Sequence, residues 1–156
     1  DLVSAKNGNL SDWRNTAQGS LALVILLDQF SRNLYRGTPA AYVNDVQAQD
    51  VVVSLLERDG HLSFNIPAKI IFYHPLHHAE NLIFQRKAVS LFEEMLEHAS
   101  DEWRESISRN LAFIKNHCDI ISKFGRFPHR NTILGRQSTP EEHQYLQQDK
   151  RTYGQQ

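Results

Sequence analysis

The longest helical pattern in the chain runs from Asp101 to Phe124, and it restricts the fold more than any other feature. At about 100° of rotation per residue, its apolar side chains gather on one stripe. The stripe consists of Trp103, Ile107, Leu111, Ile114, Cys118 and Ile121. Ser100 precedes the pattern as an N-cap, and Gly125 follows it as a helix stop. So long a one-sided helix predicts packing against other helices.

Helical patterns also cover most of the remaining chain, and no segment alternates apolar and polar residues as a strand does. Pro75 is expected to interrupt one of these patterns, and Gly60 to end another. Thr139 and Glu142 form a capping box that starts a short terminal helix. The other predicted helices cover residues 16–34, 38–59, 66–73 and 77–99. The sequence therefore predicts an all-α, multi-helical fold, with a single domain over residues 1–156.

Composition excludes several classes of protein. The formal net charge is −1, and acidic and basic residues are interspersed, so no basic surface for nucleic acid is predicted. The longest apolar run, Leu21 to Leu27, is far too short to cross a membrane. Cys118 is the single cysteine and favours a reducing compartment, so we expect a cytoplasmic protein with no membrane partner. The chain begins at Asp1 without Met, and we expect residues upstream of it.

Polar residues interrupt the apolar faces of the predicted helices. His117 and Asn110 fall among the apolar residues of a second stripe, beside Phe113, Ile120 and Phe124. His117 is either a core histidine bonded to a backbone carbonyl or part of a site. Asp119 lies about 160° from His117 around the helix, so these two residues are not a catalytic pair.

A second polar group falls in the predicted helix 77–99. His78, Asn81 and Gln85 share the face that Val89 and Phe92 continue as apolar. Unpaired burial would cost roughly 1–3 kcal/mol for each polar group, so they must meet partners, water or a ligand. Glu80 points to another side of the first turn and serves either the helix dipole or a site.

Two further segments carry charged side chains next to apolar ones. Asp28 and Arg32 have the spacing of a helical ion pair, and with Gln29 they form either a structural network or a ligand site. In the segment FGRFPHRN, Phe124 to Asn131, Gly125 ends the long helix and the proline makes the rest a stiff turn. Such a turn can direct its polar side chains at the helix ends or at the polar faces. These side chains are Arg126, His129, Arg130 and Asn131.

Metal or nucleotide chemistry has little support in the sequence. The segment YHPLHHAE holds three histidines and Glu80, but Pro75 separates them and no HExxH pattern is present. The chain contains no P-loop, dinucleotide-binding glycine loop or GxSxG elbow. We therefore predict no dedicated metal site, and the sequence indicates no particular cofactor.

Three motifs carry a family resemblance: LALVILLDQFSRNLYRGT, PLHHAENLIFQ and HCDIISKFGRFPHRNTILGRQSTPEE. In this order they resemble the bacterial family of unknown function numbered 924. The resemblance implies a tetratricopeptide-like α-α superhelix of antiparallel helix pairs, and it transfers no activity. It also implies that the family's usual N-terminal segment, which opens with an aromatic-rich helix, is missing here.

The family pattern falls on particular residues of each motif. Departures from it occur at Ser31, Ala79 and Asn81, and the last of these removes a carboxylate from the candidate site. The matched positions are Asp28, Gln29, Phe30, Arg32, Asn33, Pro75, His78, Glu80, Gln85, His117, Asp119, Gly125, Arg126, Phe127, Pro128, His129, Arg130 and Asn131.

Three hypotheses for function follow. The first is a pocket for a small anionic metabolite with candidate catalytic residues His78, Glu80 and His129. Its candidate ligand-binding residues are Asp28, Gln29, Arg32, Gln85, His117, Arg126, Arg130 and Asn131. The second is an interaction module whose groove binds an acidic peptide, and the third is a purely structural polar network. We prefer the first, because periodicity places the polar residues inside the helical faces.

Overall fold

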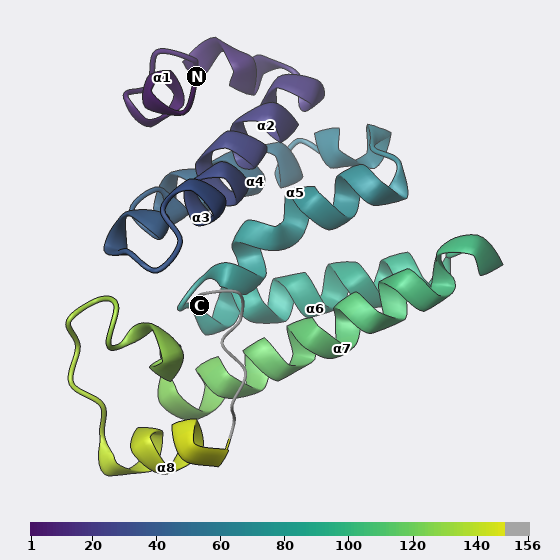
Figure 1. The fold of residues 1–156 in the computed structure, drawn as a ribbon. Helices are drawn as coiled ribbons and strands as arrows, with labels where there is room; N and C mark the ends of the chain where they lie inside the picture. Colours follow the sequence, from purple (N-terminus) through teal and green to yellow (C-terminus); the bar gives the residue numbers. More distant parts are fainter. Residues whose placement is uncertain (149–156) are drawn as a thin grey trace.

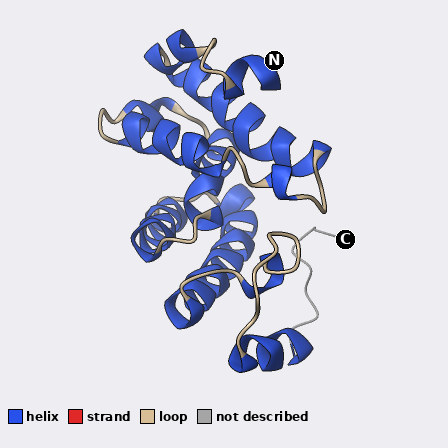
Figure 2. Cartoon of the chain, turned by 90° about the vertical axis from the view of Figure 1, so that its left-hand side faces the viewer, coloured by secondary structure: helices blue, strands red, loops and turns tan. Residues whose placement is uncertain are grey.

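The computed structural model describes residues 1–148, and all regular elements in this range are helices (Figures 1 and 2). The prediction of an all-α fold is therefore confirmed for this range. The single domain over residues 1–156 stays a prediction, and residues 149–156 lie outside the described part. The α-helices are α1 Leu2–Lys6, α2 Ala17–Val24, α3 Ser31–Leu34, α4 Asp45–Leu56, α5 Ile66–His78, α6 Leu82–Glu97, α7 Asp101–Phe124 and α8 Pro140–Gln148. Short 3₁₀ turns cover Ser11–Asn15, Pro39–Ala41, Gly60–Ser63 and Pro128–Arg130.

Helix α5 lies between two helical layers. On one side, α2 and α3 form a rod along which α4 packs, and on the other side α6 and α7 form a long antiparallel pair (Figure 1). The chain then turns at Pro128–Arg130, and α8 packs against this turn. No helix within residues 1–148 is both long enough and apolar enough to cross a membrane.

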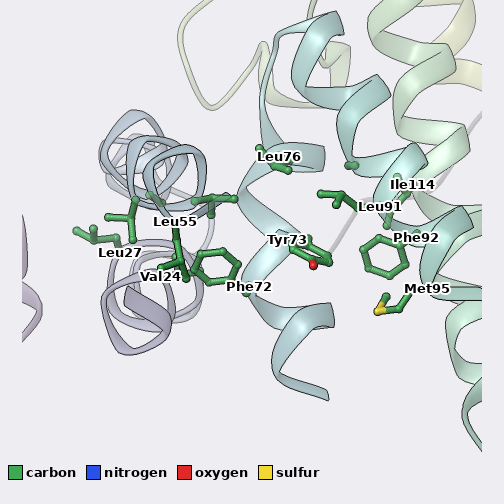
Figure 3. Close-up of a cluster of buried hydrophobic side chains, with 14 of the residues drawn as sticks. Val24, Leu27, Leu55, Phe72, Tyr73, Leu76, Leu91, Phe92, Met95 and Ile114 are labelled. Atoms are coloured by element: carbon green, nitrogen blue, oxygen red, sulfur yellow. The ribbon is translucent and has the colours of Figure 1, made fainter. Parts of the chain in front are cut away.

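The core follows from the position of α5. Phe72 points towards Val24 and Leu55, whereas Tyr73 points towards Phe92 on α6 (Figure 3). The Tyr73 and Phe92 rings meet edge to face, with centroids 6.1 Å apart. Because α5 is buried on both sides, its C-terminal turn, which carries the histidines of YHPLHHAE, lies inside the protein.

The first predicted helix is confirmed, with one local difference. Thr16 caps it by accepting the Gly19 N–H at 3.0 Å, and the helical path continues to Leu34. Its middle, Ile25–Phe30, is a π-helical segment that the sequence pattern did not predict. Such segments often occur at functional sites. This one contains Asp28, which is fully buried.

The second predicted helix begins later and ends earlier than predicted. The Thr38 hydroxyl donates to the Tyr35 carbonyl at 2.8 Å and caps no helix. A turn follows in which buried Asn44 donates to the Ser31 hydroxyl at 2.9 Å, and regular helix begins only at Asp45. The helix ends at Leu56, ahead of the left-handed Asp59.

The predicted break at Pro75 was wrong, because α5 runs through this proline to His78. Burial of α5 on both faces compensates for the missing proline N–H. The break comes instead at Ala79, and Asn81 then caps α6 through its side-chain oxygen. His78, Asn81 and Gln85 therefore do not share one helical face.

Helix α7 has its predicted bounds and α8 its predicted start, although the Ser100 side chain makes no cap hydrogen bond. Gly125 ends α7 in the left-handed region, with φ 68°. In the capping box of α8, Glu142 N–H donates to the Thr139 hydroxyl at 3.2 Å, and the Glu142 carboxylate accepts the Thr139 N–H at 2.8 Å. Phe113 departs from the prediction for α7 because its side chain is largely exposed.

Candidate functional site

Asp28 is the centre of a buried polar cluster formed where α5 ends against the π-helical segment. Its carboxylate accepts three hydrogen bonds and has no exposed surface. His78 Nδ1 lies 2.8 Å from Oδ1, and Arg32 Nε lies 3.0 Å from the same oxygen. Gln29 Nε2 donates to Oδ2 at 2.6 Å and also lies 3.1 Å from His74 Nδ1. The predicted pair of Asp28 and Arg32 is thus present, but inside a larger network.

Electrostatics fixes the protonation of this cluster. Burial alone would raise the pKa of Asp28, but His78 and Arg32 hold it well below its usual range. Burial, followed by the charge of Arg32, lowers the pKa of His78 to about 3. At neutral pH, Asp28 is therefore ionised and His78 is neutral. Arg32 is then the charge that keeps Asp28 ionised.

The tautomer of His78 follows from these charges. An ionised Asp28 only accepts hydrogen bonds, so His78 Nδ1 carries the proton and donates it. Arg32 Nε also lies 3.1 Å from His78 Nδ1, but a protonated Nδ1 cannot accept, so the Arg32 bond goes to Asp28. The other ring nitrogen, Nε2, keeps its lone pair and has no hydrogen-bond partner among residues 1–148. Asp28 thereby orients a neutral histidine with a free acceptor.

Asp45 links this cluster to a second arginine. One of its oxygens accepts Arg32 Nη2 at 2.9 Å, and the other lies 3.6 Å from Arg130 Nη1. Burial raises the pKa of Asp45, and the two arginines oppose the rise. The Tyr42 ring packs against both guanidinium groups, at 5.4 Å from Arg32 and 4.7 Å from Arg130. The Tyr42 hydroxyl is buried and has no partner in the described chain.

Arg130 is the least completely bonded charge in the site. It is 6% exposed, and it donates through Nη2 to the His78 carbonyl at 3.0 Å. Its Nε is buried without a partner among the residues described. Burial, followed by the charge of Arg32, lowers the pKa of Arg130 to about 10. The Arg130 side chain remains cationic at neutral pH.

Two cavities at this site share lining residues. An inner one of about 50 Å³ is lined by Arg32, Tyr42, His78, Phe113, His117, His129 and Arg130. An open groove of about 540 Å³ lies beside it, and Tyr42 and Arg130 line both spaces. The inner volume suffices for a few water molecules or the head of a small ligand. No group of three or more His, Cys, Asp or Glu side chains within residues 1–148 is placed to hold a metal ion.

His117 and His77 form a buried pair beside the inner cavity. His117 Nδ1 donates to the His77 carbonyl at 3.0 Å and lies 3.3 Å from His77 Nδ1. This is the backbone-bonded core histidine that was one of the two interpretations of His117. Burial lowers the pKa of His77 well below its ordinary value, so His77 is neutral. His129 approaches from the turn after α7, with its ring 5.3 Å from that of Phe127.

A second polar network, which we call the clasp, fixes the segment FGRFPHRN. Glu80 accepts two hydrogen bonds from Arg136, at 2.6 and 2.8 Å, and the Phe127 N–H at 2.8 Å. Arg126 makes two bonds to Glu142, at 2.7 and 2.8 Å. Asn131 joins the two pairs, because it accepts from Arg136 at 2.9 Å and donates to Glu142 at 3.2 Å.

Gln85 has a structural contact of the same kind. It is fully buried, and its Nε2 donates to the carbonyls of His77 and Ala79, both at 2.7 Å. These carbonyls lie at the C-terminal end of α5, where no intrahelical donor is available. Gln85 therefore caps α5 from α6.

The structure divides the sequence-predicted residues into two groups. One group surrounds the inner cavity or the residues that line it: Asp28, Gln29, Arg32, His78, His117, His129 and Arg130. Glu80, Gln85, Arg126 and Asn131 instead bond to the clasp or to helix ends. The prediction missed Tyr42 and Asp45 in the site and Arg136 in the clasp. Arg136 lies within the third family motif, whereas Tyr42 and Asp45 lie outside all three and carry no sequence signal.

Fold and site together define an all-α protein whose helices enclose a buried cluster of an aspartate, a histidine and two arginines. The chain belongs to the family described as bacterial protein of unknown function (DUF924), whose model matches residues 1–150. A solved structure of a protein of unknown function from Agrobacterium tumefaciens is 36% identical, with a TM-score of 0.83. The match covers 95% of this chain and 78% of the other. No curated protein matches the chain.

Proposed function

We propose that the protein binds a small organic anion at the inner cavity, with the anionic group on Arg130 and His78 placed to exchange a proton with it. The observation that carries this proposal is the pairing of two incompletely bonded groups in one cavity. These are the buried Nε of Arg130 and the acceptor Nε2 of His78. Both would gain hydrogen bonds from a carboxylic acid or a phosphate.

The charge of Arg130 supports an anion rather than a neutral ligand. A buried guanidinium is stable only when it is paired. The nearest Asp45 oxygen lies 3.6 Å from Arg130, and the other oxygen of the same carboxylate is bonded to Arg32. A carboxylate or phosphate oxygen fits the planar donors of arginine better than other common groups do. The Tyr42 hydroxyl supplies one more possible donor at the same place.

His78 supports a role in proton transfer. Its ring is oriented by Asp28, as a general base must be, and it is neutral at neutral pH; with a pKa of about 3 it is a weak base until a ligand raises that pKa. A bound anion would add negative charge beside His78 and raise its pKa. The ring could then take up a proton at neutral pH and return it to the ligand. Anion binding and proton uptake by His78 are therefore coupled.

The test is a thermal-shift titration with acetate and inorganic phosphate, repeated on two arginine variants. Arg130→Gln should abolish the ligand-induced rise in Tm. Arg126→Gln is the matched control, because Arg126 lies in the same turn but bonds to Glu142. It should lower the starting Tm and keep the ligand-induced rise. If neither anion shifts the wild-type Tm, the pocket hypothesis fails.

The interaction-module hypothesis predicts a different result in the same assay. A groove that reads only an acidic peptide would respond to a peptide carboxyl terminus and not to free acetate or phosphate. Its response would also be insensitive to His78→Asn, because no proton transfer is involved. The small-anion proposal requires that His78→Asn weaken anion binding more at pH 5.5 than at pH 8.

A further inference from the structure

The open groove beside the site indicates what kind of anion binds there. We infer that the ligand is a monoanion with an apolar body of several carbon atoms, whose charged end lies on Arg130 and whose body lies in the groove. This inference rests on the proposed function, since it takes Arg130 as the anion contact. It adds the chemical class of the rest of the ligand.

The side chains shared by the inner cavity and the groove are the first argument. Arg130 and Tyr42 line both the inner cavity and the groove. An anionic group on Arg130 therefore has room for only a few atoms inward, within about 50 Å³. Outward it has about 540 Å³, which is the size of an ordinary small-molecule pocket. The larger part of any ligand must extend outward.

Apolar side chains at the groove are the second argument. Val43 and Val46 line it and are 60% and 68% exposed, respectively. Pro39, Leu134 and the Tyr42 ring complete the apolar lining. Leaving two valines exposed beside a buried arginine costs the free protein hydrophobic free energy. A ligand with an apolar body would recover that free energy by covering them.

The third argument is that most polar groups in the groove already have hydrogen-bond partners within the protein. Asp45 is bonded to Arg32, and both Glu80 oxygens are bonded to Arg136. The Asn81 side-chain oxygen accepts the N–H groups of Ile83 and Phe84 at the start of α6. Apart from Tyr42 and Arg130, the Gln49 side-chain amide and Asn81 Nδ2 have no partner among the described residues and are the available polar contacts. A sugar or a polyanion would find few free groups in this groove, whereas a hydrocarbon body needs none.

The experiment is a titration with straight-chain monocarboxylates from acetate to octanoate, followed by NMR or calorimetry. Each methylene that the groove buries should lower Kd by about twofold to fourfold, as expected for partial to full burial. Straight-chain alkylammonium ions of the same lengths should not bind, because Arg130 repels them. A Kd independent of chain length would overturn this inference and leave the anion site standing. No binding of any carboxylate or of phosphate would overturn both.

Two matched variants locate the apolar body. Val46→Asp places a charge in the groove and should weaken octanoate binding by roughly tenfold, since three or more methylenes lose their contact. The added charge repels the charged end of both ligands alike, so the loss for acetate should be the smaller one, and the difference between the two losses reports the methylene contacts. Val3→Asp changes an equally exposed valine on α1, away from the groove, and should leave both ligands unaffected. Equal losses in the two variants would show that octanoate binds elsewhere and refute the assignment.

Discussion

Replacement of Asp28 by asparagine tests the electrostatic account of the site. The substitution keeps the shape of the side chain and removes its charge in a position with no solvent exposure. One amide oxygen can still accept from His78 and Arg32, at the present distances of 2.8 and 3.0 Å. The amide nitrogen would face Gln29 Nε2 at 2.6 Å, so a donor would meet a donor.

The magnitude follows from these three contacts. The His78 bond becomes a neutral one, and the Arg32 bond loses its ionised acceptor, so roughly 1 kcal/mol is lost at each. The Gln29 bond is lost outright, which costs roughly another 1–3 kcal/mol. The sum, about 3–5 kcal/mol, matches the cost of breaking a buried ion pair. It is roughly a fifth or more of the stability of a typical domain, which is about 5–15 kcal/mol.

The assay is urea denaturation of wild type and Asp28→Asn at pH 7. The matched control is Asp50→Asn, because Asp50 is exposed on α4 and should change stability by less than about 0.5 kcal/mol. A loss below about 1 kcal/mol in Asp28→Asn would refute the reasoning, since it would mean that Asp28 is not ionised in the folded protein. A loss equal to that of the control would do the same.

Three further predictions concern pH, a helix cap and a turn. The pKa of His78 is about 3 in the folded protein and 6.5 in the unfolded chain, so the unfolded chain binds more protons between these pH values. The free energy of unfolding should therefore be highest above pH 6.5 and fall below it, by up to about 1.4 kcal/mol per pH unit. A urea midpoint that stays the same from pH 7.5 to 4.5 would contradict this. Gln85→Ala should cost about 2–4 kcal/mol, measured by denaturation, because the carbonyls of His77 and Ala79 lose their donor. Gly125→Ala should lower the free energy of unfolding by about 1–2 kcal/mol. The loss comes from backbone strain alone, because φ is 68° and no atom lies within 4 Å of the added Cβ. An unchanged Tm would show that the turn can relax.

Local patterns predicted the parts of the fold that are local. The apolar stripe of α7 and the pairing of Asp28 with Arg32 follow from helical periodicity. Pro75 was misinterpreted because the penalty of a helical proline is local, whereas the burial that outweighs it depends on both neighbouring layers. Asp45 was missed for a related reason. The predicted helix began in the turn at Pro39, which placed Asp45 in its interior. The helix in fact begins at Asp45, whose side chain faces two arginines.

The partners of the predicted residues could not be read from the sequence either. Glu80 was expected to serve the helix dipole or a site, but its two oxygens bond to Arg136, far along the chain. Sequence spacing identifies which side chains are polar where apolar ones are expected, but it does not show which of them will meet. That outcome depends on the route of the chain through Ala79 and through the turn after Gly125.

The completeness of the hydrogen bonds separates the two polar networks. In the clasp, each carboxylate oxygen of Glu80 and Glu142 has a donor, and the arginines that bond them line neither the inner cavity nor the groove. Around the inner cavity, buried Arg130 and Tyr42 each keep one atom without a partner among the described residues. A network selected only for stability would have no reason to leave buried donors unbonded at a cost of roughly 1–3 kcal/mol each. Among the described residues, Gln85 Oε1 and His61 Nδ1 also lack partners away from the inner cavity, but Arg130 Nε and the Tyr42 hydroxyl are unbonded donors that line one and the same space, which is the arrangement expected if a ligand completes their bonds.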